Sequence, residues 1–218
     1  MTAVTGERRV TMVDYGGSNM RSVQKAFEAV GVAIEVTSDP EVARRAVRLV
    51  LPGVGAFRPG MDALRSRGLD GAIVDAVAAG TPLLGICLGM QLLFAASEEM
   101  GRHKGLGLLP GQVVAFVGRP PTANAPGLKV PHMGWNRIRH EDQHPLLAGV
   151  PNGSYAYFVH SYYCAPANPQ DILATTDYGV EFAAIVGRGR LYGIQFHPEK
   201  SQRIGLAILR NFAQMETG

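Results

Sequence analysis

Two short segments of this sequence, far apart along the chain, carry side chains suited to nucleophilic catalysis. Cys87 stands at the centre of Gly85-Ile86-Cys87-Leu88-Gly89, and the second segment reads Gln195-Phe196-His197-Pro198-Glu199. A cysteine can attack as a nucleophile, a histidine can take and return a proton, and a carboxylate can orient the histidine. We therefore predict that Cys87, His197 and Glu199 form a catalytic triad, which requires the fold to bring the two segments together.

The glycines around Cys87 indicate how its thiol would be presented. A residue at a sharp turn between a strand and a helix has a strained backbone, and its neighbours at minus two and plus two must lack side chains. Gly85 and Gly89 occupy those positions. A cysteine taken alone is more often a small buried hydrophobe. At the start of a helix, however, free N–H groups stabilise a thiolate, and the N–H of Leu88 can donate to an oxyanion.

A second loop with glycines, Pro52-Gly53-Val54-Gly55, follows an apolar run. Its glycines allow a backbone path in which an amide turns toward a ligand, and the loop can equally be a tight turn before a helix. The two interpretations are compatible. The glycine patterns typical of nucleotide phosphate binding do not occur in the sequence.

The segment His140-Glu141-Asp142-Gln143-His144 matches the His-Glu-x-x-His pattern of zinc proteases. That site needs both imidazoles on one face of a helix. Pro145 biases His144 away from a helical backbone, and residues 137–143 are almost entirely polar. We predict a surface turn here, with no metal and no cofactor in the protein.

Alternating apolar and amphipathic stretches predict the elements that position these residues. In the first half the pattern is that of a parallel sheet with crossover helices, and in the second half it is that of mixed or antiparallel strands. We predict an α/β fold in which a single domain, residues 1–218, holds an open mixed sheet flanked by helices. The predicted strands are 9–13, 33–37, 47–51, 82–86, 112–117, 155–164 and 182–186, and the predicted helices are 20–30, 69–79 and 88–95.

Loops leave the first, third and fourth of these strands, and parallel strands end at one edge of a sheet, where open α/β sheets bind their ligands. We also expect an exposed loop at 118–127.

The composition is 46% hydrophobic and 18% charged, which is typical of a soluble protein. Its charge of +3 is spread along the chain and does not favour nucleic-acid binding. With no leader, no membrane-length run and only two cysteines, Cys87 and Cys164, we predict a cytoplasmic protein without disulfides.

Taken together, the motifs resemble the class I, or triad, glutamine amidotransferases, and the resemblance covers nearly the whole chain. PGVGAF at 52–57, GICLGMQLL at 85–93 and QFHPEKS at 195–201 fall in the order of that family. Within the family, VPHMGWN at 130–136, YFVHSY at 157–162 and DYG at 14–16 resemble the glutaminase subunits of imidazole glycerol phosphate synthases. One departure is Ser18, where we expect those subunits to carry glycine.

The resemblance implies a mechanism. Cys87 would attack the side-chain amide of L-glutamine and form a thioester, and His197 would protonate the leaving nitrogen, so that ammonia is released. His197 would then activate the water that hydrolyses the thioester to glutamate. It also implies an oxyanion hole and a substrate site. The oxyanion hole would comprise Val54 or Gly55 with Leu88, and Gly53, Gln91 and Ser161 would bind the substrate.

Ammonia that reaches water becomes ammonium, which is not a nucleophile, so a glutaminase of this kind should dock on the enzyme that it supplies. The resemblance implies a (β/α)₈ barrel cyclase as partner in a heterodimer, which makes imidazole glycerol phosphate and aminoimidazole carboxamide ribonucleotide in histidine biosynthesis. We expect neither nucleic acid nor membrane as a partner. The interface candidates are Asn19, Trp135, Asn136 and Lys200, although Trp135 could equally be a core aromatic.

Two other functions remain open. The chain could be the glutaminase of another synthase, such as one for pyridoxal phosphate, anthranilate or guanylate, against which the PHMGWN segment at 131–136 argues. It could also be a non-catalytic relative, but such a protein should have lost a member of the triad.

Overall fold

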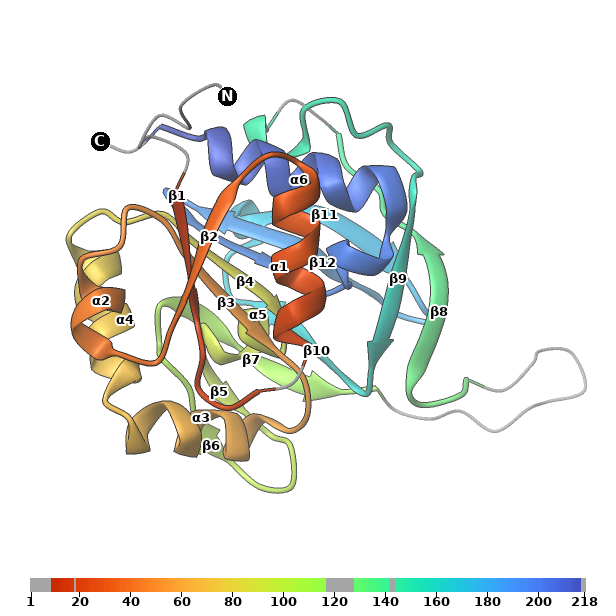
Figure 1. Ribbon diagram of the computed structural model, residues 1–218. Coiled ribbons are helices and arrows are strands. Elements are labelled where there is room, and N and C mark those ends of the chain that lie inside the picture. The colour runs from red at the N-terminus through yellow and green to blue at the C-terminus, as the bar shows by residue number, and fades with distance from the viewer. Residues whose placement is uncertain (1–8, 18, 117–127, 142–143, 217–218) are drawn as a thin grey trace, which may run out of the picture.

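A seven-stranded mixed sheet forms the centre of the computed structural model, which describes residues 9–17, 19–116, 128–141 and 144–216 (Figure 1). The predicted exposed loop at 118–127 lies outside these residues, as does Ser18. In order across the sheet the strands are β11 (Ile172–Asp177), β12 (Glu181–Arg188), β13 (Leu191–Ile194), β4 (Leu83–Cys87), β3 (Leu49–Gly53), β1 (Arg9–Val13) and β2 (Ala33–Thr37).

The two halves of this sheet differ in direction, as the sequence predicts. One half is parallel and consists of the neighbouring strands β2, β1, β3, β4 and β13. The other half is antiparallel, since β12 pairs antiparallel with β13 on one side and with β11 on the other. Every residue of β3 and β4 is buried. Central parallel strands are covered on both faces, which explains their continuous apolar sequence.

Helices cover both faces of the sheet. Along β3, Val50 belongs to one hydrophobic cluster, and Leu49 and Leu51 belong to another, because successive side chains of a strand point to opposite faces. Val50 shares its cluster with residues of α1 and α6, and Leu49 and Leu51 share theirs with residues of α3, α4 and α5. The helices are α1 (Met20–Ala29), α2 (Pro40–Arg44), α3 (Phe57–Ser66), α4 (Leu69–Ala78), α5 (Leu88–Leu92) and α6 (Gln202–Gln214).

Two smaller sheets, which the sequence did not predict, lie beside the central one (Figure 1). The first has four strands in the order β10-β7-β5-β6, and the second is the antiparallel pair β8-β9. Their bounds are β5 (Phe94–Ser97), β6 (His103–Lys104), β7 (Leu109–Ala115), β8 (His132–Arg137), β9 (Tyr155–His160) and β10 (Tyr162–Pro166).

Two predicted elements were wrong, and tertiary pairing explains both. The predicted strand 155–164 is two strands, since β9 pairs with β8, and β10 pairs with β7 after a break at Ser161. The predicted helix 88–95 ends at Leu92, because Phe94 pairs with Leu109 in the four-stranded sheet. Among the described residues, no helix is long and apolar enough to span a bilayer.

Candidate functional site

Cys87 lies on a strained turn between a strand and a helix. It is the last residue of β4 and the residue before α5. Its backbone has φ 55° and ψ −112°, and residues other than glycine rarely adopt a positive φ of this kind. A Cβ at Gly85 would lie 2.7 Å from the backbone oxygen of Gly89, and a Cβ at Gly89 would lie 1.7 Å from the backbone oxygen of Leu51. The close packing of these backbones therefore requires glycine on both sides of Cys87, as predicted for a sharp turn between a strand and a helix.

His197 and Glu199 form a buried pair. They flank Pro198 at the start of a short 3-10 turn, Pro198–Lys200, and their side chains are 3% and 2% exposed. His197 Nδ1 lies 2.8 Å from Glu199 Oε1. Because a carboxylate only accepts, Nδ1 carries the proton, and Nε2 is the nitrogen left for chemistry.

The charges around His197 favour its protonated form. Burial lowers its pKa, but the Cys87 thiol and the Glu199 carboxylate outweigh burial and raise the pKa to about 9. For Glu199 the effects have the opposite signs. Burial raises the pKa of its carboxyl group, but the hydrogen bonds and charge of His197 and the hydrogen bond from Asn19 outweigh burial and hold this pKa below its ordinary value. An imidazolium beside a cysteine favours the thiolate, which is the nucleophilic form.

Cys87 and His197 line one cavity of about 320 Å³, so the fold does bring the two distant segments together. Five other predicted residues line the same cavity: Val54, Gly55, Leu88, Gln91 and Ser161. The predicted site residue Gly53 is not among the lining residues. Five lining residues were not predicted as site residues: Glu99, Pro131, Val159, His160 and Tyr162.

Gly53, the last residue of β3, packs closely against the cysteine turn. Gly53 pairs with Cys87 in the parallel register, and a Cβ on Gly53 would lie 2.3 Å from the hydroxyl of Tyr15 and 3.0 Å from the backbone nitrogen of Gly89. Gly55 has φ +100°, a conformation suited to glycine. Val54 and Gly55 follow directly and line the same cavity as Cys87.

Glu99 adds a negative charge to the cavity wall. Its Oε2 accepts a hydrogen bond of 2.6 Å from the backbone N–H of Phe57. In the sequence, Glu98 and Glu99 look like an ordinary exposed acidic pair, and only the packing of distant segments shows that one of them faces the cavity.

Asn19 contacts the carboxylate of the buried pair. Its Nδ2 donates to Glu199 Oε1 over 2.7 Å, so this oxygen receives both Asn19 and His197. Asn19 has φ 76° and immediately precedes α1. This predicted interface candidate therefore contacts Glu199, a member of the predicted triad, directly.

The other interface candidates surround the β8-β9 pair. Trp135 is 47% exposed, which is contrary to a core position, and its ring centre lies 5.9 Å from that of Tyr157. Lys200 Nζ lies 5.5 Å from the centre of the same tyrosine ring. The amide of Asn136 is engaged within the chain, where its Nδ2 donates to the backbone oxygen of Asp177 over 2.8 Å.

Strand β9 is also hydrogen-bonded to the backbone of His197. The backbone N–H of His197 donates to the Tyr157 oxygen over 2.9 Å. Ser201 Oγ accepts from the Tyr157 N–H over 3.0 Å and donates to the His197 oxygen over 2.7 Å. A separate groove of about 670 Å³, lined by Trp135 and Ser201 among others, opens on this arrangement.

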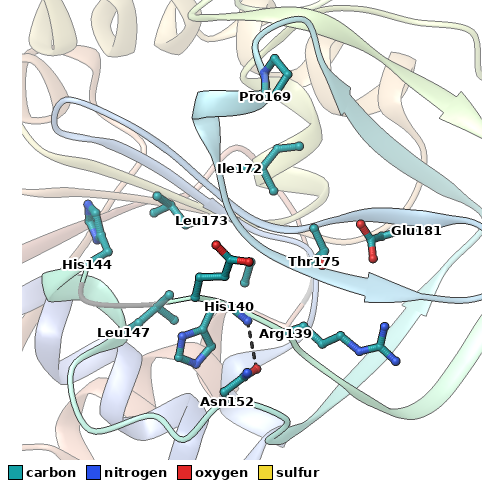
Figure 2. Close-up of a pocket in the computed structure, with 12 residues that line it drawn as sticks. Arg139, His140, His144, Leu147, Asn152, Pro169, Ile172, Leu173, Thr175 and Glu181 are labelled. Carbon is teal, nitrogen blue, oxygen red and sulfur yellow. Dashed lines mark hydrogen bonds between the residues drawn. The ribbon is translucent and has the colours of Figure 1, made fainter.

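The zinc-like segment lies at another pocket, of about 730 Å³ (Figure 2). The backbone of His144 is extended, with φ −67° and ψ 132°, and its Nδ1 accepts from the N–H of Leu146. The backbone N–H of His140 donates to Asn152, and the two imidazoles lie apart in Figure 2. Asp142 and Gln143 lie outside the described residues. Within the described part of the chain, no group of histidine, cysteine and acidic side chains could hold a metal ion.

The chain is similar to known proteins over nearly its whole length. The family model "Glutamine amidotransferase class-I" matches residues 11–215. The chain is 51% identical to "Imidazole glycerol phosphate synthase subunit HisH" of Salinibacter ruber over 208 residues, covering 95% of this chain and 94% of that protein. It is also 51% identical to the protein of that name from Geobacillus kaustophilus over 209 residues, covering 96% and 98%.

Solved structures agree on the fold. A crystal structure described as glutamine amidotransferase superposes with a TM-score of 0.71 at 17% identity, covering 94% of this chain and 99% of that one. The structure of PurLQS from Thermotoga maritima superposes with a TM-score of 0.69 at 19% identity, covering 94% and 96%.

Proposed function

The chain belongs to the class I glutamine amidotransferases, and from this premise we propose that it is the glutaminase subunit of an imidazole glycerol phosphate synthase. The single observation that carries the proposal is the meeting of Cys87, on its strained turn, with the His197–Glu199 pair at one cavity. The subunit name shared by relatives about half identical over nearly the whole chain supports the choice of synthase.

In the proposed reaction, the Cys87 thiolate attacks the side-chain carbonyl carbon of glutamine. The N–H of Leu88 and an N–H of the Val54–Gly55 loop stabilise the oxyanion. The C–N bond then breaks, and His197 Nε2 gives its proton to the leaving nitrogen, so that ammonia and a thioester form. His197 next takes a proton from water, and the hydroxide displaces Cys87 and releases glutamate.

The remaining lining residues suit the amino-acid end of glutamine. The carboxylate of Glu99 complements the α-ammonium group, and Gln91 and Ser161 supply hydrogen bonds. Gly53 acts through the backbone, because its register with Cys87 sets the position of the loop that follows. Glu199, held by Asn19, keeps the proton on His197 Nδ1.

The partner that we propose is the (β/α)₈ barrel cyclase, which uses the ammonia to convert a phosphoribulosyl carboxamide nucleotide into imidazole glycerol phosphate and aminoimidazole carboxamide ribonucleotide. The proposed docking face contains Trp135 and Lys200, which are exposed, together with two half-buried residues: Asn19, which contacts Glu199, and Asn136, whose Nδ2 lies 3.3 Å from His132 Nε2. Ammonia would then pass between active sites without meeting bulk water.

The test is a Cys87→Ala variant assayed in complex with the cyclase. We expect loss of glutamine-dependent imidazole glycerol phosphate formation, at least about a thousandfold, whereas synthesis from added ammonium salt continues. Cys164→Ala is the matched control, because Cys164 is buried and does not line the cavity. Glutamate release by Cys87→Ala at the wild-type rate would refute the mechanism, and failure of the cyclase to bind or stimulate the wild-type chain would indicate another synthase.

A further inference from the structure

Two buried histidines stand beside the cavity and have no part in the proposed chemistry. His132 of β8 and His160 of β9 are partners in the antiparallel register and are 2% and 7% exposed. His132 Nδ1 lies 3.1 Å from His160 Nε2. Aromatic rings surround them, with Tyr178 and Phe158 stacked on His132 at 4.0 and 4.9 Å between ring centres.

Hydrogen bonds extend from this pair in both directions. On one side, His160 Nδ1 lies 2.8 Å from the backbone oxygen of Tyr162. On the other side, His132 Nε2 lies 3.3 Å from Asn136 Nδ2, which also donates to the backbone oxygen of Asp177. Each of the four ring nitrogens therefore has one partner.

The partners fix the direction of every bond. A backbone oxygen only accepts, so His160 Nδ1 must carry a proton. In a neutral His160 the Nε2 then accepts, which makes His132 Nδ1 a donor and leaves His132 Nε2 to accept from Asn136. Burial lowers the pKa of His132 to about 4. Burial, with His132 and His197, lowers the pKa of His160 to about 3, although its bond to Tyr162 acts in the opposite direction. Both rings are thus neutral at pH 7, and only one arrangement of protons satisfies all the contacts.

The chain of bonds ends on a residue of the glutamine cavity. The Tyr162 oxygen that accepts from His160 also accepts from Gln91 Nε2 over 3.0 Å, and that Nε2 lies 3.3 Å from Gln195 Oε1. Both N–H groups of Gln91 are therefore directed at acceptors, and its Oε1 is the atom left for a ligand. Tyr162, His160 and Gln91 all line the cavity.

We propose that Asn136, His132 and His160 are positioning residues whose one-way hydrogen-bond chain holds the Tyr162 carbonyl and so directs Gln91 Oε1 to the α-amino group of glutamine. The proposal rests on the proposed glutaminase function, because it names glutamine as the ligand. It gives the segment 131–136 a role inside the protein, in addition to the docking role of Trp135.

The first experiment reads the protons directly. In the full chain labelled with ¹⁵N-histidine, we expect NMR at pH 7 to show His132 and His160 as neutral rings protonated at Nδ1, the less common tautomer of free histidine. A proton on Nε2 of either ring, or a charged ring, would overturn the chain. This measurement does not depend on any activity.

The second experiment uses two substitutions of similar shape. His160→Leu removes the donor to Tyr162, and we expect KM for glutamine to rise about tenfold with kcat changed less than about twofold. His160→Asn keeps an N–H near the Nδ1 position and should restore KM to within about threefold of wild type. His140→Gln, at the separate pocket of Figure 2, is the control histidine and should leave both constants unchanged.

The outcomes separate the two proposals. Equal KM values for the Leu and Asn variants, or a fall in kcat as large as the fall in kcat/KM, would overturn the positioning role. A wild-type chain that releases no glutamate with the cyclase present would overturn the proposed function. Since the NMR experiment needs no substrate, it decides the direction of the hydrogen-bond chain in that case, and also if His160→Leu does not fold.

Discussion

A single carboxylate oxygen, Glu199 Oε1, holds His197 and Asn19 together. It receives both His197 Nδ1 and Asn19 Nδ2, and the side chain is almost fully buried. A buried carboxylate is costly unless it is hydrogen-bonded, so each donor supports the charge that the histidine needs. The proposed triad thus includes a fourth residue, with Asn19 supporting Glu199.

Asn19→Ala should weaken this arrangement measurably. Asn19 lowers the pKa of Glu199, so its loss moves that pKa upward, and the carboxylate is protonated at a higher pH. We expect kcat/KM for glutamine to fall about tenfold at pH 7, because hydrogen bonds to charged groups contribute about 1.5–3 kcal/mol. The acidic limb of the pH–rate profile should also shift to higher pH.

The control for this prediction is Asn211→Ala. Asn211 also donates to backbone oxygens, those of Leu146 and Ala148, but it does not line the cavity. Its substitution should leave the acidic limb in place. An unchanged acidic limb in Asn19→Ala would show that Glu199 does not depend on Asn19.

At the scale of elements, the site depends on how closely β3, β4 and α5 approach one another. Glycine at 85 and 89 lets the α5 backbone lie on β3 and β4, and this contact holds Cys87 in its strained conformation. Strain of this kind costs about 1–3 kcal/mol and persists only when the surrounding structure enforces it.

Gly89→Ala should therefore be severely destabilising. A Cβ at this position would lie 1.7 Å from the Leu51 oxygen, which belongs to the sheet and cannot move aside cheaply. We expect the free energy of unfolding to fall by at least about 3 kcal/mol, measured by chemical denaturation. Gly71→Ala is the matched control in α4. No atom lies within 4 Å of its added Cβ, and alanine there should stabilise the helix by up to about 1 kcal/mol. Equal stabilities of the two variants would contradict this packing argument.

Elements with local signals could be predicted from the sequence. Strands 9–13 and 33–37 have the predicted bounds, because short apolar runs between turn residues suffice to define them. The break at Ser161 and the end of α5 could not be predicted, since both follow from pairing with β7, which is distant in sequence from Ser161. The same holds at the site. The segments of Cys87 and His197 have recognisable motifs, whereas Glu99 reaches the cavity through tertiary packing that leaves no local pattern.

At the scale of the whole molecule, the surface around β8 and β9 combines exposed aromatic side chains with a backbone hydrogen bond from His197 to Tyr157. Trp135 and Met133 are 47% and 62% exposed on β8, and Lys200 lies beside Tyr157 on the neighbouring strand. Large apolar side chains exposed together often mark a surface that another protein covers. This face is where we expect the cyclase to bind.

Trp135→Ala should weaken that complex without disturbing the fold. Aromatic residues at the centre of an interface contribute about 2 kcal/mol or more, so we expect Kd for the cyclase to rise at least about thirtyfold. Titration calorimetry would measure Kd, and the melting temperature should stay close to that of wild type. Met100→Ala, at a side chain 90% exposed elsewhere on the surface, is the control. Unchanged affinity in Trp135→Ala would place the docking face on another side of the molecule.

The Ser201 hydroxyl, which bridges the backbones of Tyr157 and His197, has a consequence for inhibition. The groove lined by Trp135 and Ser201 shares no lining residue with the cavity of Cys87 and His197, so Ser201 connects it to His197 only through the hydrogen bond to the His197 backbone oxygen. A compound lodged there that pushed Tyr157 away from His197 would misalign the base while leaving room for substrate. Such a compound would lower the maximal rate, and no excess of glutamine would reverse it.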